Sequence, residues 1–140
     1  MKSGIKKEVY DSYHIPGQPN FMRRPKNAVH ISPGNGLKHE VLKTWVCYAL
    51  RKEGVNYITE CVRNKKVDGA DRRVDIVNLH TGEEIEIEMT ERRARRFQDH
   101  SNVTVIKGWL SETWDRFEHD FGRALPAPIS ETEEEEPDEA

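Results

Sequence analysis

Three carboxylates gather on two short stretches that the sequence predicts to be neighbouring strands. Asp75 stands in the first stretch, and Glu86 and Glu88 alternate with apolar residues in the second. If the connecting turn is centred on Thr81-Gly82, Asp75 lies directly opposite Glu88 and diagonal to Glu86. Like charges at this spacing repel, so a cation, neighbouring arginines or raised pKa values must relieve them. Converging carboxylate oxygens suit a hard divalent cation, and the expected cofactor is Mg²⁺ or Mn²⁺.

Two other interpretations of these carboxylates stay open. Strict alternation of charged and apolar residues is also the ordinary pattern of a strand with one face in water, where the carboxylates would only be solvated. Alternatively, Arg72 or Arg73, which stand just before Asp75, would neutralise the carboxylates in a structural ion pair. We favour the cation because three acidic side chains crowd onto one hairpin.

The elements that must position these residues follow from periodicity and turn chemistry. In chain order the sequence predicts a helix from Leu37 that ends at Gly54, strands over Asn56–Arg63, Val74–Leu79 and Glu84–Thr90, a helix over Glu91–Asp99, a strand over Val103–Lys107 and a helix over Ser111–Phe121. The helix before the last strand can act as a crossover. The expected fold is therefore α/β, with a mixed four-stranded sheet flanked by helices and an αβββαβ core.

The run Arg73-Val74-Asp75-Ile76-Val77-Asn78-Leu79, then Gly82, then Ile85-Glu86-Ile87-Glu88, resembles the central motif of the PD-(D/E)XK (restriction-endonuclease-like) nuclease superfamily. The resemblance covers roughly residues 37–110. It implies a divalent cation held by Asp75, Glu86 and an acidic residue on the first helix. Glu40 matches that last position, and Glu60 on the first strand is a second candidate for it.

The resemblance also implies the roles of these residues in catalysis. Asp75, Glu86, Glu88 and Glu40 would form the catalytic set, and Asp75, Glu86 and Glu40 would bind the metal. Glu88 stands where the family usually has lysine, so the motif is a Glu-x-Glu variant. Some restriction enzymes of the superfamily work with this variant, whereas members with eroded motifs are inactive. The missing positive charge could also come from elsewhere, for example from Lys65, Lys66 or Arg92.

Arginines flank the acidic motif on both sides. In the helix predicted directly after it, Arg92, Arg95 and Arg96 fall on one face. Together with Arg72 and Arg73 they are the predicted nucleic-acid-binding residues, because guanidinium groups bind phosphate without reading base sequence. The alternative is a solvated charged face. His39, beside Glu40, is expected at the surface rather than as a ligand.

Composition divides the chain of 140 residues into three parts. Residues 1–36 form a basic arm predicted to be irregular, residues 37–125 form the α/β domain, and residues 126–140 form an acidic tail predicted to be disordered. The net charge of −3 hides a mildly basic body, since the last ten residues hold seven acidic groups. No stretch is predicted to be a signal peptide or a membrane span. Two isolated cysteines favour reduced thiols and a cytoplasmic protein.

These features predict a metal-dependent nuclease that hydrolyses phosphodiester bonds, as an endonuclease or an exonuclease. Its expected partner is nucleic acid, with DNA favoured, and a homodimer is compatible with the sequence. The alternative is a catalytically inactive nuclease-fold protein that binds DNA or serves as an accessory protein of viral, plasmid or repair origin. A structural or protein-interaction domain with merely solvated carboxylates is the third class. The sequence does not decide between DNA and RNA.

Overall fold

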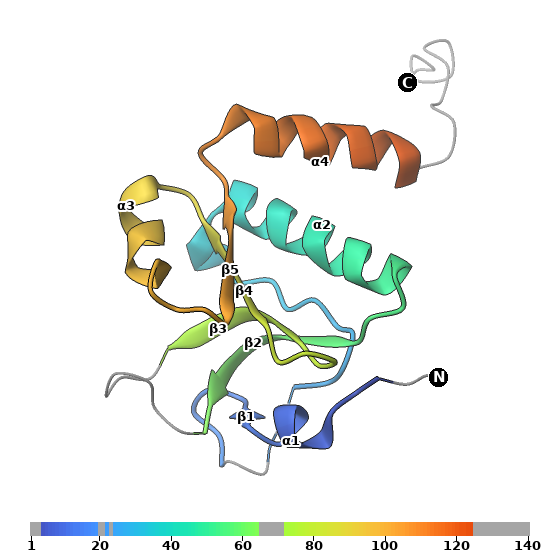
Figure 1. Ribbon diagram of the computed structural model, residues 1–140, viewed down its shortest axis with the longest axis vertical. Coiled ribbons are helices and arrows are strands. Elements are labelled where there is room, and N and C mark those ends of the chain that lie inside the picture. Colours follow the sequence, from blue (N-terminus) through green and yellow to red (C-terminus); the bar gives the residue numbers. More distant parts are fainter. Residues whose placement is uncertain (1–3, 20–21, 23, 65–71, 125–140) are drawn as a thin grey trace, which may run out of the picture.

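A mixed sheet of five strands forms the centre of the molecule (Figure 1). The computed structural model describes residues 4–19, 22, 24–64 and 72–124. The strands are β1 (Tyr13–His14), β2 (Tyr57–Arg63), β3 (Arg73–Asn78), β4 (Glu84–Glu88) and β5 (Val103–Lys107). The helices are α1 (Lys7–Tyr10), α2 (Leu37–Lys52), α3 (Glu91–Ala94) and α4 (Ser111–Ala124), with short 3₁₀ turns η1 (Pro33–Asn35) and η2 (Arg95–Phe97). The predicted α/β class is confirmed.

The sheet has the strand order β1-β2-β3-β4-β5, and only β4 and β5 run parallel. A parallel pair needs a crossover, which α3 and η2 supply between β4 and β5. Thr90 starts this crossover, because its hydroxyl accepts a hydrogen bond from the Arg93 amide at 3.3 Å. The predicted helix over Glu91–Asp99 is thus split into one α turn and one 3₁₀ turn.

The prediction of four strands is wrong by one, because the arm before residue 37 adds an edge strand. Tyr13 pairs with Arg63 of β2, and its side chain is buried. The same arm contains α1 and η1, so it is less irregular than its turn-forming residues predict. Burial of Tyr13 explains why this segment folds back onto the sheet rather than staying in solvent.

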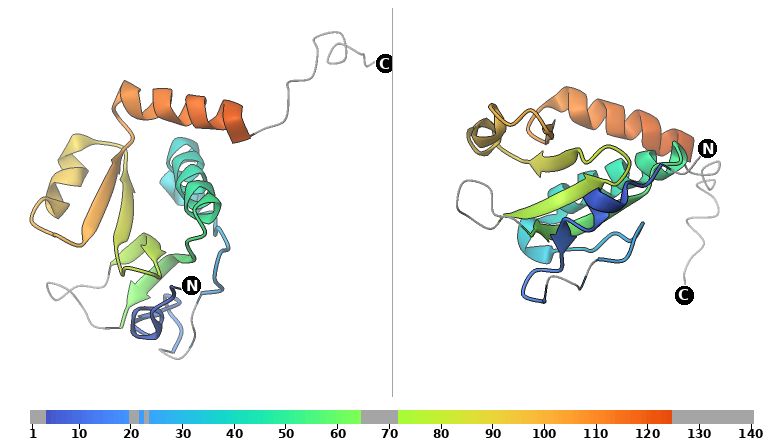
Figure 2. Two further views of the ribbon diagram at one scale, coloured as in Figure 1. Left: turned by 45° about the vertical axis from the view of Figure 1, so that its right-hand side comes forward. Right: turned by 60° about the horizontal axis from the view of Figure 1, so that its bottom comes forward.

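Two apolar clusters hold the layers together. In the first, α2 and α4 pack on the sheet, and the Trp45 and Phe117 rings meet edge to face at 5.9 Å. Figure 2 shows α4 lying alongside α2. In the second, the N-terminal segment around Val9 and Tyr13 covers Ile58 and neighbouring strand residues. No helix in the described part of the chain is long and apolar enough to cross a membrane.

The turn between β3 and β4 sets a register that differs from the predicted one. Ile76 pairs with Ile85, which places Asp75 across from Glu86 rather than across from Glu88. Asn78 causes the difference, since its side-chain oxygen accepts hydrogen bonds from the two amides that follow Leu79, at 2.8 and 3.2 Å. This arrangement moves the turn toward the N-terminus by one residue and shifts the pairing by two.

Some predictions fall outside the described residues. The candidate lysines Lys65 and Lys66 belong to this group, and so does the whole acidic tail over 126–140. Cys47 and Cys61 are both described, and they are free and buried, as the prediction of reduced thiols requires.

Candidate functional site

A pocket of about 440 Å³ opens where β3 and β4 run past the start of α2 and the α3–η2 segment. Its wall combines acidic and basic side chains with a few neutral groups. The lining residues are Gly34, Asn35, His39, Glu60, Arg72, Arg73, Asp75, Glu86, Ile87, Glu88, Met89, Arg93 and Arg96. All three carboxylates of the predicted hairpin therefore reach one cavity.

The floor of this pocket is a row of carboxylates on three adjacent strands. The pairing of β2 with β3 places Glu60 across from Asp75, and the pairing of β3 with β4 places Glu86 on the other side of Asp75. The β2–β3 ladder lacks the Glu60–Asp75 pair, and the β3–β4 ladder ends at Ile76–Ile85, just before this row. The Asp75 carboxylate instead accepts a hydrogen bond from the Ile87 amide at 2.8 Å. The row therefore lies beside the pocket, whose lining includes all three of these carboxylates.

Glu86 is a buried pocket residue whose pKa is strongly raised. Burial and then the nearby Asp75 carboxylate raise the pKa of Glu86 to about 9. Arg72 acts in the opposite direction, since its Nη1 donates to Glu86. The pKa stays high because Arg72 also donates to the fully buried Glu84 at 2.6 Å, so one guanidinium serves two carboxylates. The raised pKa favours the protonated form of Glu86 at neutral pH, so a cation bound here would displace that proton.

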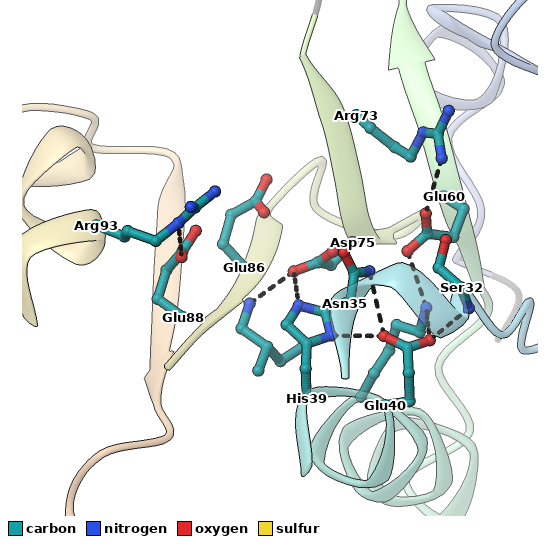
Figure 3. Close-up of polar contacts among 12 residues, drawn as sticks. Ser32, Asn35, His39, Glu40, Glu60, Arg73, Asp75, Glu86, Glu88 and Arg93 are labelled. Atoms are coloured by element: carbon teal, nitrogen blue, oxygen red, sulfur yellow. Dashed lines mark hydrogen bonds and ion pairs between the residues drawn. The ribbon is translucent and has the colours of Figure 1, made fainter. Parts of the chain in front are cut away.

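His39, near the start of α2, lies between the carboxylates of Asp75 and Glu40, as Figure 3 shows. Its Nε2 lies 3.3 Å from Asp75, and its Nδ1 lies 2.5 Å from Glu40. Burial alone would lower the pKa of His39, but hydrogen bonding to Asp75 and Glu40 raises it overall. The expectation of a surface histidine is wrong: His39 is only 8% exposed. The spacing of residues on a helix could not show that its start abuts Asp75.

Glu40, the predicted third ligand, does not line the pocket. Its oxygens accept hydrogen bonds from the Ser32 amide at 2.8 Å and from Asn35 at 3.2 Å, and they also contact His39 and the Lys43 ammonium, the latter at 2.6 Å. These contacts lower the pKa of Glu40 against the effect of burial. Glu40 is thus a well-satisfied structural carboxylate behind His39.

The arginines of the α3–η2 segment face the pocket, although not in the predicted combination. Glu88 lies 3.5 Å from both Arg93 and Arg96. Both guanidinium groups remain more than half exposed, so they form the rim of the pocket. Arg92 and Arg95 do not line it. Arg93 and Arg96 stand three residues apart and so share a face of a helix, but the sequence does not show which of the arginine faces packs against the strand that carries Glu88.

The donors in the pocket fit a hard divalent cation in their chemistry, because they are carboxylate oxygens. One of them, Oε1 of Glu60, is buried and accepts no hydrogen bond from any residue that the structure describes. In the described part of the chain, however, no three His, Cys, Asp or Glu side chains are placed so as to hold a metal ion together. The Arg72 guanidinium instead pairs with Glu86. The predicted alternative of relief by Arg72 therefore describes the observed contacts.

Comparison with models of protein families, with curated proteins and with solved structures found no match to this chain. The function must be inferred from the site itself.

Proposed function

We propose that this protein is a metal-dependent nuclease that hydrolyses phosphodiester bonds in nucleic acid, with DNA as the favoured substrate. The observation that carries the proposal is one pocket with a carboxylate floor and a guanidinium rim. Asp75 and Glu86 lie on the floor, and Arg93 and Arg96 stand at the mouth. A phosphodiester with a divalent cation presents both charges that this arrangement would bind.

Each part of the pocket has a defined task under this proposal. Asp75 and Glu86 would hold Mg²⁺ or Mn²⁺, which supplies Lewis acidity and an activated water when bound. His39 orients Asp75 from α2, because it is buried and its two ring nitrogens face two carboxylates. The exposed guanidinium groups of Arg93 and Arg96 would position the phosphate chain. Glu88, held between those arginines, is the group that could accept a proton at the mouth.

A specific observation favours a second candidate function. Arg72 already contacts Glu86, and its guanidinium carbon lies over the Phe97 ring at 5.0 Å from the ring centroid. A site in which Arg72 always occupies Glu86 would bind nucleic acid through the arginines at its rim and would not cleave it. This function corresponds to a nuclease-fold DNA-binding protein without catalysis.

A cleavage assay separates the two functions. Linear, nicked, single-stranded and branched DNA would be incubated with the protein and Mg²⁺, Mn²⁺ or EDTA. Metal-dependent cleavage that Asp75→Asn abolishes and Asp115→Asn preserves would support the nuclease. Asp115 is a matched control because it is an exposed aspartate on α4 outside the pocket. Activity that survives Asp75→Asn would refute the proposed site.

A binding assay tests the rim independently of catalysis. The double variant Arg93→Gln/Arg96→Gln should weaken DNA binding and reduce the slope of log K against log salt by about 2, since each phosphate contact contributes about 0.9. The control is Arg92→Gln/Arg95→Gln, which removes the same charge from the same segment without touching the pocket. Equal losses in both variants would show that the rim has no special role.

A further inference from the structure

The strand β5 is the outermost strand at one end of the sheet (Figure 1). Among the described residues it pairs only with β4, in parallel. Such an edge presents amide and carbonyl groups that a further strand can use. A pocket of about 380 Å³ lies against β5, and its lining residues are Trp45, Val105, Ile106, Lys107, Leu110, Glu112, Thr113 and Arg116. The edge is therefore a candidate interaction surface.

The backbone of β5 faces β4 and the free edge in alternation. The Glu84 amide donates to the carbonyl oxygen of Asn102 at 2.9 Å, and the Gly108 amide donates to that of Glu88 at 2.8 Å. In a parallel pair that continues between these two bonds, the even-numbered residues of β5 direct their backbone groups to β4. The odd-numbered residues direct theirs to the free edge, and these residues are Val103, Val105 and Lys107.

Two of the outward groups already have partners within the chain. The Val103 amide donates to the carbonyl oxygen of His100 at 3.2 Å, and the Lys107 carbonyl oxygen accepts a hydrogen bond from the Leu110 amide at 3.2 Å. The other outward groups have no backbone partner among the described residues, and they are the Val103 carbonyl, the Val105 amide and carbonyl, and the Lys107 amide. The free donors and acceptors are therefore arranged symmetrically about Val105.

This set of groups is complementary to itself. If a second copy lies antiparallel to β5 with Val105 on the two-fold axis, the Val105 amide of each copy faces the Val105 carbonyl of the other. Each Lys107 amide then faces the Val103 carbonyl of the other copy. Every free backbone group of both edges thereby gains a hydrogen-bond partner.

Neighbouring registers use the edge less completely. With the axis at Thr104, the Val105 carbonyl would face a Val103 amide that is already bonded within its own chain. With the axis at Ile106, the Val105 amide would face a Lys107 carbonyl that is likewise already bonded. The local turns at the two ends of β5 therefore favour the register centred on Val105.

The side chains of β5 are compatible with this pairing. Directly opposed residues share a face, so each Lys107 would lie across from an apolar Val103 and not across from the other lysine. Val105 would meet its own copy, and β-branched residues pack well across strands. On the opposite face, Ile106 would lie across from the exposed Thr104. Within β5, the pairing therefore places no like charges opposite each other.

We propose that β5 is a dimerisation edge, at which two copies of this chain pair antiparallel through Val103–Lys107 about a two-fold axis at Val105. This inference goes beyond the proposed function, because it concerns another surface and holds whether or not the chain cleaves nucleic acid. Glu86 stands beside Val105 in the β4–β5 register, so both pockets would open on the same face of the joined sheet. The two Glu86 residues would lie three strand spacings apart, which is roughly 14 Å.

Sedimentation equilibrium of the full chain over a wide range of concentration tests the dimer. The unmodified protein should approach twice its monomer mass of 16.3 kDa as the concentration rises. Val105→Pro should stay monomeric, because proline lacks the amide donor at the axis. Since that amide points away from β4, the substitution removes no hydrogen bond within the monomer. Val105→Thr is the matched control, which keeps the amide and a β-branched side chain and should dimerise like the unmodified protein.

Two results of this experiment would overturn the proposal. One is a monomer at every concentration up to the limit of solubility. The other is a folded Val105→Pro variant that dimerises as strongly as Val105→Thr. Circular dichroism and thermal unfolding would establish that the proline variant is folded.

Cysteine cross-linking tests the register without relying on the proline variant. In the proposed pairing, position 104 lies opposite position 106 of the other copy in a non-hydrogen-bonded pair, with Cα atoms about 4.5 Å apart. This distance permits a disulfide, whereas positions 104 of the two copies lie too far apart for one. A mixture of Thr104→Cys and Ile106→Cys chains should therefore cross-link on mild oxidation, and Thr104→Cys alone should cross-link far less.

The native cysteines give little background in this assay, because Cys47 and Cys61 are both buried. The unmodified chain, oxidised in parallel, measures that background. Cross-linking of Thr104→Cys alone to the same extent as the mixture would overturn the register, and a mixture that does not cross-link would overturn the proposed dimer.

Discussion

Glu84 and Glu86 stand two residues apart on β4, yet folding shifts their pKa values in opposite directions. Glu84 is fully buried and accepts hydrogen bonds from Tyr13, Arg63 and Arg72, each at 2.6 Å. Burial alone would raise the pKa of Glu84, but these donors lower it overall. Glu86 has only a share of Arg72 and a nearby carboxylate, and its pKa is raised to about 9.

The difference separates a carboxylate whose hydrogen bonds are complete from one that lines the pocket. Two residues with the same chemistry on the same strand have the same alternation and nearly the same burial. What distinguishes them is the number of donors that other elements bring. Tyr13 of β1, Arg63 of β2 and Arg72 all donate hydrogen bonds to Glu84. Glu86, in contrast, lines the pocket. A buried acid with a strongly raised pKa is therefore a better candidate site residue than a buried acid as such.

Of the substitutions considered, removal of Glu84 should reduce the free energy of unfolding most. Glu84→Ala leaves buried donors without their acceptor and is expected to reduce the free energy of unfolding by about 3–5 kcal/mol. Urea denaturation at neutral pH would measure the loss. Because the pKa of Glu84 is lowered on folding, its stabilisation is present above its ordinary value near 4.5 and is lost as the pH falls below it. A loss below about 1 kcal/mol would contradict the structural role.

Removal of Arg72, which donates to both Glu84 and Glu86, should have an intermediate effect on the free energy of unfolding. Arg72→Ala is expected to destabilise the fold by about 1–3 kcal/mol, since two hydrogen bonds to charged groups are lost. If Arg72 occupies the position of a cation, the same variant should bind Mn²⁺ more tightly, by roughly tenfold, which corresponds to about 1.4 kcal/mol. Titration calorimetry would measure the affinity. Weaker Mn²⁺ binding in Arg72→Ala would mean that Arg72 supports the site rather than blocking it.

Neutralisation of Glu86 should have the smallest effect near neutral pH. Its pKa is raised from an ordinary value near 4.5 to about 9, so the folded state binds more protons than the unfolded state between these values. The stability of the native protein should therefore fall as the pH rises through this window. Glu86→Gln, which mimics the protonated acid, should change stability by less than about 1 kcal/mol at pH 6 and should remove part of this decline. Melting temperatures from pH 5 to pH 9 would test this, and a parallel decline in both proteins would contradict it.

Much of the fold could be predicted because its elements have strong local patterns. The structure confirms a long helix from Leu37, three strands, a crossover helix, a strand over Val103–Lys107 and a final helix from Ser111. The edge strand was missed because two residues carry too little periodicity to be recognised. Only the burial of Tyr13 against β2 makes that segment a strand.

The register of the β3–β4 hairpin could not be predicted from the alternation of apolar and charged residues. A slip of one residue would turn the apolar face of a strand toward solvent, but a slip of two keeps every side chain on its face. The alternation around Glu86 therefore fits both the predicted and the observed pairing equally well. The side chain of Asn78 decides between them through the turn.

The sequence by itself determined which residue types are available and which of them alternate or share a helix. It therefore indicated Asp75, Glu86 and Glu88 as one cluster on a hairpin, along with the arginines that follow them, but it placed Asp75 opposite Glu88 rather than Glu86. Only the tertiary structure decided which acids have hydrogen-bond donors. The donors to Glu40 and Glu84, and the lack of one at Oε1 of Glu60 among the described residues, depend on contacts between distant segments. Local patterns record the periodicity of the backbone, whereas the neutralisation of a buried charge depends on every element that packs around it.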